Sequence, residues 1–184
     1  MSGEPVNELN PFERAGLYVS LHAYLSWVAG GGGEPPVEVF SFFEALGIQL
    51  PREISRETAD YVKNFRAGVS RTDLSPVARA SLPHHLTAFY KSAGYLSTEP
   101  ADSLSAMTAF AARLAMDAYT AHVRGEGDAE GLERKLYRFV NTHLMPALEY
   151  LKPEEPAAAE AVKALTELIK EDAETLKAKL SRKP

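Results

Sequence analysis

The sequence predicts an all-α protein, a single-domain helical bundle of about seven helices. Apolar residues recur three and four positions apart along most of the chain, as they do on one face of a helix. The valine clusters are short and lie inside this helical periodicity, and no Asn-Gly hairpin signal occurs. With 184 residues, of which 45% are hydrophobic, the chain is long enough for one domain with its own core.

Composition and charge indicate which kinds of binding partner suit this chain. The net charge of −5 argues against a nucleic-acid partner, because phosphate binding needs a basic face, and it suits a partner with a short positive segment. Cysteine is absent, which excludes disulfides and thiolate-bound zinc. The N-terminus lacks the basic region of a signal peptide, and no apolar run reaches the length of a membrane span. We therefore expect a soluble cytoplasmic protein.

The first half of the chain predicts three helices. Asn10 and Pro11 form a cap and a first helical turn, and the helix runs to the connector 30–33, four consecutive glycines. A short helix over 37–46 is apolar on most faces, so we expect it to be well buried. A third helix begins near Ser55 and carries Tyr61 and Phe65. Polar residues over 69–75 then predict an exposed loop.

The second half predicts four more helices. One runs from Pro83 to Gly94, preceded by a single helical turn or a loop over 77–80. The next starts near Pro100, and its regular apolar stripe places it centrally in the bundle. Asp128 caps the following helix, in which Pro146 should cause a kink or an early end. The segment 153–181 is an amphipathic C-terminal helix that packs on the body formed by 10–150.

Neither a metal site nor catalytic machinery is evident. No His-x-x-x-His or Glu-x-x-His pair occurs, and no Gly-x-Ser-x-Gly elbow, so we expect no enzyme activity and no cofactor. Two carboxylate pairs do stand at predicted helix starts. For Glu154 and Glu155, the favourable interaction of negative charge with the helix macrodipole is sufficient to explain their position at a helix start. The position of Glu99 and Asp102 has two possible explanations. One is the same dipole effect; the other is that they form an anionic patch, beside an aromatic-rich helix end, and that this patch holds an arginine side chain.

Several segments in order resemble the TorD/DmsD/NarJ family of redox-enzyme maturation chaperones. The main run is Phe89-Tyr90-Lys91-Ser92-Ala93-Gly94-Tyr95 followed by Glu99-Pro100-Ala101-Asp102-Ser103-Leu104. The segments 13–18, 60–65 and 139–148 are similar to the family's Arg-x-x-x-Tyr, Tyr-x-x-Leu-Phe and Phe-x-x-x-His-Leu-x-Pro patterns. Ser103 stands where the family has a histidine, and 75–81 lacks its Pro-Pro-Tyr-Glu-Ser loop. The chain therefore resembles a divergent member.

The resemblance implies a cytoplasmic chaperone, monomeric or homodimeric. Its partner would be the twin-arginine signal peptide, or the apo form, of a molybdopterin-containing oxidoreductase before export or assembly. Such a peptide has two arginines followed by an apolar stretch, so its receptor needs carboxylates beside an apolar groove. The hypothesis is that Asp102, supported by Glu99, pairs with an arginine. Four residues would line the groove, Tyr61, Phe65, Leu82 and Tyr90, and Pro100 and Ser103 would lie at its edge. The alternatives are a helical scaffold or adaptor, and a nucleotide-binding helical protein.

Overall fold

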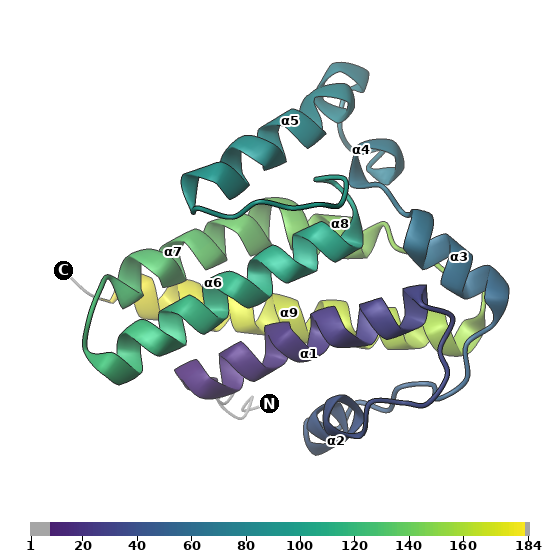
Figure 1. The fold of residues 1–184 in the computed structure, drawn as a ribbon, viewed down its shortest axis with the longest axis horizontal. Helices are drawn as coiled ribbons and strands as arrows, with labels where there is room; N and C mark the ends of the chain where they lie inside the picture. The colour runs from purple at the N-terminus through teal and green to yellow at the C-terminus, as the bar shows by residue number, and fades with distance from the viewer. Residues whose placement is uncertain (1–7, 183–184) are drawn as a thin grey trace, which may run out of the picture.

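The computed structural model describes residues 8–182, and this part of the chain is a bundle of helices without a β-strand (Figure 1). The predicted all-α class is confirmed. The helices are α1 (Pro11–Ala29), α2 (Val37–Ala45), α3 (Arg56–Asn64), α4 (Ala67–Ser70), α5 (Pro76–Ser92), α6 (Leu104–Arg124), α7 (Ala129–Phe139), the π-helical turn η1 (Val140–Leu144), α8 (Met145–Glu149) and α9 (Pro156–Ser181).

Helices α7, η1 and α8 follow one another without a break. If this segment is counted once and the single turn α4 is left aside, the described chain has the predicted seven helices. The disturbance predicted at Pro146 takes the form of η1. The backbone N–H of Met145 donates to Val140 O, one residue further back than in an α-helix. This wider turn comes just before the proline, which has no N–H to donate.

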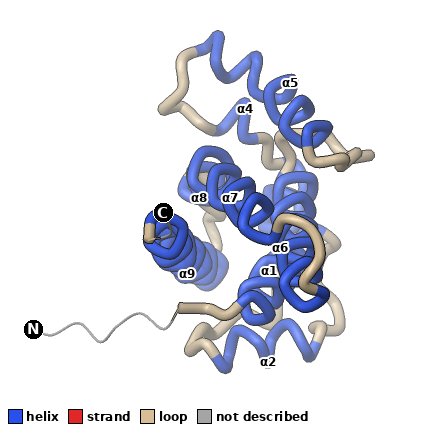
Figure 2. Tube along the Cα trace, turned by 90° about the vertical axis from the view of Figure 1, so that its left-hand side faces the viewer, coloured by secondary structure: helices blue, strands red, loops and turns tan. Residues whose placement is uncertain are grey.

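Helices α1 and α6 run antiparallel through the centre of the bundle (Figure 1). The predicted stripe of α6, formed by Leu104, Met107, Ala111, Leu114 and Ala118, is buried. Helix α7 packs on α6, and α9 packs along α7, η1 and α8. Figures 1 and 2 show α2 at one edge of the bundle and α5 at the opposite edge. Helix α2 buries less than predicted, since only Phe40 and Phe43 are fully enclosed.

The segment over 69–75 is mostly exposed, as predicted, but it differs from a simple loop in two respects. Part of it forms α4, and Arg71 is buried. The guanidinium of Arg71 donates to Asp73 Oδ2 (2.6 Å) and to Thr142 O (3.3 Å). Because arginine has several N–H groups in a fixed fork, one side chain can hold this loop against η1. The polar composition therefore indicated exposure correctly for most of the loop, with Arg71 as the exception.

Helix α5 begins at Pro76 rather than at Pro83. Ser75 Oγ accepts a hydrogen bond from Ala78 N (3.2 Å), which satisfies one free N–H of the first turn. Pro83 lies inside the helix, where it removes one backbone hydrogen bond. The cap and the burial of one face outweigh this cost; the buried residues are Leu82, Leu86 and Tyr90.

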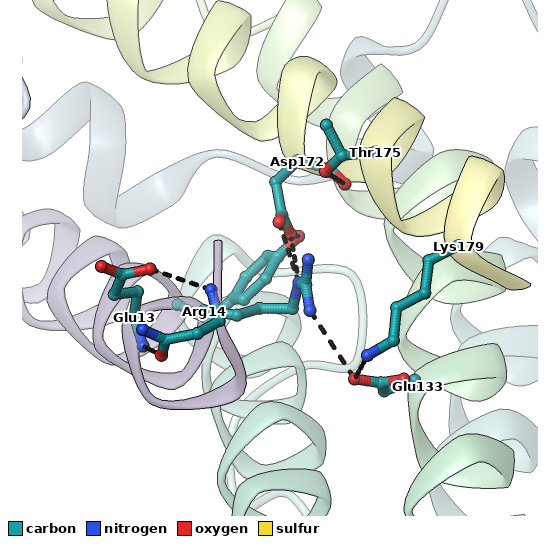
Figure 3. Close-up of polar contacts among 8 residues, drawn as sticks. Glu13, Arg14, Glu133, Asp172, Thr175 and Lys179 are labelled. Carbon is teal, nitrogen blue, oxygen red and sulfur yellow. Dashed lines mark hydrogen bonds and ion pairs between the residues drawn. The ribbon is translucent and has the colours of Figure 1, made fainter. Parts of the chain in front are cut away.

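A buried polar network fixes α9 to the rest of the bundle (Figure 3). Arg14 of α1 donates through Nε to Asp172 Oδ1 of α9 at 2.8 Å, and Tyr18 Oη donates to Asp172 Oδ2 at 3.0 Å. Glu133 of α7 lies 3.6 Å from Arg14 Nη1 and accepts a hydrogen bond from Lys179 of α9 at 2.8 Å. Charges buried in this way are tolerated only when they are paired, so the network sets the position of α9.

Candidate functional site

Asp102 is buried and already has a cationic partner within the chain. Only 2% of the residue is exposed. Its Oδ1 accepts a hydrogen bond from Arg66 Nε (2.6 Å), Arg66 Nη2 forms an ion pair with it, and its Oδ2 accepts from Gly68 N (3.0 Å). The hypothesis that Asp102 pairs with a client arginine is therefore corrected. This carboxylate joins the α3–α4 connection to the start of α6.

Three of the four residues predicted to line a groove lie in the core instead. Phe65, Leu82 and Tyr90 are all buried. The ring of Tyr90 packs on Phe110, with ring centroids 4.7 Å apart, and Phe110 packs on Phe139 at 4.8 Å. Tyr90 Oη donates to Ala101 O at 2.6 Å. These aromatic contacts hold α5 and the 95–103 loop against α6 and α7, so the three residues serve packing rather than an open groove.

The other predicted residues of the 99–103 run lie either at the surface or at the N-terminal cap of α6. Helix α6 starts at Leu104 rather than near Pro100, and Ser103 Oγ caps it by accepting from Ala106 N (3.2 Å). Glu99 and Pro100 are exposed. Glu99 and Ser103 line a pocket of about 300 Å³ between the C-terminal end of α1, α3 and the start of α6. This small pocket is separate from the position of Tyr61.

Tyr61 lines a pocket that the sequence did not reveal. The pocket has a volume of about 690 Å³ and lies between α3 and the segment that leads into α9. Three carboxylates line it, those of Glu57, Glu154 and Glu155, together with Lys152. Tyr61 is 37% exposed, and its Oη accepts a hydrogen bond from Lys152 N at 2.9 Å. We call this hollow the acidic pocket.

Within the acidic pocket Glu155 has a structural role. Its Oε2 accepts hydrogen bonds from Thr58 Oγ1 (2.7 Å), Ser55 Oγ (2.8 Å) and Ser55 N (3.2 Å). These bonds, first that from Thr58, lower the pKa of Glu155 below its usual range. They tie the start of α3 to the start of α9, which lie side by side in Figure 1. Glu57 and Glu154 are exposed, and among residues 8–182 no cation lies within ion-pair distance of either.

An apolar groove adjoins the acidic pocket. It has a volume of about 510 Å³ and lies between α8 and the first half of α9. Its apolar lining comes from Leu148, Leu151, Ala159 and Val162. Lys152 lines both hollows, so the groove and the acidic pocket meet at this residue. Glu149, Lys163, Glu167 and Lys170 also line the groove, although most of its lining surface is apolar. Carboxylates and an aromatic ring thus stand at one end of a mainly apolar channel.

The sequence pattern explained Glu154 and Glu155 only as charges at a helix start, and it did not connect them with Glu57 because these residues come from distant segments. Glu57 and Tyr61 are four residues apart on α3 and so share one helix face, which is a detectable signal. Glu154 joins them only through the packing of α9 against α3. Of the predicted site residues, the structure places Tyr61 alone at the acidic pocket, and it places Glu99 and Ser103 at the smaller one.

The fold and this site define an all-helical protein with an apolar surface groove that has carboxylates at one end. No protein-family model matches the sequence, and no curated protein matches it. Within the described part of the chain, no group of three or more histidine, aspartate or glutamate side chains could hold a metal ion. None of the described helices is long and apolar enough to cross a membrane.

Proposed function

We propose that this protein is a chaperone that binds the twin-arginine signal peptide, or the apo form, of a molybdopterin-containing oxidoreductase before export or assembly. The observation that carries the proposal is the junction of the acidic pocket with the apolar groove at Lys152. A peptide with two arginines followed by an apolar stretch needs these two surfaces side by side. The ordered family-like segments over 10–150 support the same class of protein.

The acidic pocket has the chemistry to hold an arginine side chain. Glu57 and Glu154 are free to pair with a guanidinium, and the exposed ring of Tyr61 offers a face for a cation. Lys152 opposes such binding by like-charge repulsion. Its Nζ lies 5.9 Å from the centroid of the Tyr150 ring. Because of the like-charge repulsion, removal of the Lys152 charge should strengthen the binding of an arginine-containing peptide.

The test is binding of a fluorescently labelled peptide with two arginines followed by an apolar stretch, measured by anisotropy. The double variant Glu57→Gln and Glu154→Gln should weaken binding about threefold to tenfold, because each exposed ion pair contributes about 0.3–0.7 kcal/mol. Lys152→Gln should strengthen it. The matched control is Glu160→Gln with Glu171→Gln, which removes two exposed carboxylates of α9 that line neither hollow.

The contradicting result is equal affinity for this peptide and for one in which both arginines are replaced by glutamine. Equal affinity of the Glu57/Glu154 variant and its control would also exclude the acidic pocket as the arginine site. If no peptide binds, the protein is better described as a scaffold or adaptor bundle.

A further inference from the structure

The apolar groove is one part of a longer channel that follows α9 over most of its length. Residues of α9 that line successive hollows recur at steps of four and three: Ala159, Lys163, Thr166, Lys170, Ala173 and Lys177. Residues with this spacing lie on one side of a helix. Lys170 lines both the apolar groove and the next hollow, which α7, η1 and α8 close on the other side. The hollows are therefore contiguous.

The far end of this channel is basic. The two hollows beyond the apolar groove are lined by four cationic side chains, Arg134, Arg138, Lys170 and Lys177, and by one carboxylate, Glu174. Arg134 pairs with Glu130 at 2.7 Å. In the part of the chain that the structure describes, no carboxylate lies within ion-pair distance of Arg138, Lys170 or Lys177. These three exposed cations are a distinct feature of a chain whose net charge is −5.

We propose that the α9 channel binds its peptide in a single direction, with arginines in the acidic pocket, apolar residues in the groove and an acidic segment against Arg138, Lys170 and Lys177. This inference rests on the proposed function and names the third feature of the client. Charge complementarity carries it, since opposite charges stand at the two ends of one channel. The same peptide bound in the opposite direction would place like charges together at both ends.

The channel also sets the spacing between the two charged segments of the peptide. From Glu155 to Lys177 the helix rises about 33 Å at about 1.5 Å per residue. An extended peptide covers this length with about ten residues, because each residue spans about 3.3 Å. A client bound in extended form should therefore carry its acidic residues about ten positions after its arginines.

The experiment compares three labelled peptides of one composition class. The first has two arginines, an apolar stretch and then three glutamates. The second has glutamines in place of the glutamates. The third has the three glutamates directly before the two arginines, so that no binding direction places both charged segments at their proposed ends of the channel. The first should bind about fivefold to tenfold more tightly than the second and the third, as expected for two exposed ion pairs. Arg138→Glu with Lys177→Glu should abolish the advantage over the second peptide.

The matched control is Lys91→Glu with Arg124→Glu, which makes the same change in net charge at exposed positions outside the channel and should keep the advantage. Circular dichroism and thermal unfolding confirm that each variant is folded. Equal binding of the first two peptides overturns the assignment of the basic end and leaves the proposed function intact. Equal binding of the first and the third overturns the assigned order of the charged segments along the channel. Binding of none of the three overturns both the inference and the function on which it rests.

Discussion

The guanidinium of Arg66 lies against the carboxylate of Asp102, with Nε 2.6 Å from Oδ1, so the chain itself supplies the arginine that this aspartate holds. The backbone N–H of Gly68 donates a hydrogen bond to the other carboxylate oxygen, Oδ2, at 3.0 Å. A methyl group at position 68 would lie only 3.0 Å from that oxygen and 2.9 Å from Arg79 O, so glycine permits this close approach. Asp102 is therefore part of the scaffold, and the candidate peptide site lies on α9.

Asp102→Ala should lower stability rather than peptide affinity. It removes a charge-assisted hydrogen bond and leaves Gly68 N–H and Arg66 without their acceptor, which costs about 2–3 kcal/mol in the free energy of unfolding. Urea unfolding measures this change. Glu99→Ala, at an exposed carboxylate three residues earlier, should change stability by less than about 0.5 kcal/mol. A folded Asp102→Ala protein with greatly weakened peptide binding would return Asp102 to the site.

Asp172→Ala should destabilise the fold by about 3–5 kcal/mol, because Arg14 would lose its closest carboxylate while remaining buried. Addition of Arg14→Met should recover much of this loss, since no charge is then left buried and unpaired. A double-mutant cycle in urea measures the coupling. The exposed pair Arg113–Asp117 is the control, and Asp117→Ala should cost about 0.5 kcal/mol or less. Additive effects of the Arg14 and Asp172 changes would contradict the network.

His143 should make the protein less stable in mild acid. Burial, followed by the charges of His85 and Arg71, lowers the pKa of His143 to about 4. Between about pH 6.5 and pH 4 the unfolded chain binds a proton at this histidine and the folded protein does not. The free energy of unfolding therefore falls as the pH falls through this window, by up to about 3 kcal/mol.

Urea unfolding at pH 7.5, 6 and 5 tests this prediction in wild type and in His143→Leu. The variant should lose less stability on acidification, because leucine takes up no proton. Replacement by leucine breaks no bond at Nδ1, which has no hydrogen-bond partner among residues 8–182. The same pH dependence in both proteins would show that His143 is not the group responsible.

Glu154 and Glu155 are adjacent, but substitution of Glu155 should lower stability, whereas substitution of Glu154 should weaken peptide binding. Glu155→Ala removes the acceptor shared by Ser55 and Thr58 and should cost about 1–2 kcal/mol of stability. Glu154→Ala should leave stability within about 0.5 kcal/mol and weaken the binding of the arginine-containing peptide. Unfolding and anisotropy measurements on the same two proteins separate the roles. Loss of stability in both variants would argue against a free carboxylate at Glu154.

Local signals in the sequence predicted most of the helices because each signal acts within one or two turns. Asn10 and Glu13 form a reciprocal capping box at the start of α1, with bonds of 2.9 Å and 2.8 Å. Asp128 likewise caps α7 as predicted, and α3 begins next to Ser55, as predicted, with Ser55 as its cap. The predicted start of α5 was wrong. The prediction assumed that Pro83 stands at the first turn of a helix, where proline is common, whereas Pro83 lies within α5.

The candidate site was not predictable in this way because its partners are distant in sequence. The predicted pairing of Glu99 with Asp102 assumed that neighbours share a surface, but Asp102 is buried and Glu99 is exposed. Ser55 and Glu155 are 100 residues apart, and no local spacing connects them. Helix α9 brings them together only after it has packed on the bundle.

The link between Arg14 and Asp172 spans 158 residues, which affects folding during synthesis. At about 5–20 residues per second, a ribosome needs roughly 8–30 s to go from one partner to the other. Until α9 emerges, Arg14 lacks its closest carboxylate, and its burial would leave a charge that is not fully paired. The polar side of α1 that carries Arg14 therefore reaches its final environment only after α9 has been made, whereas the contacts of α1 with α2, α3 and α6 involve segments that are synthesised earlier.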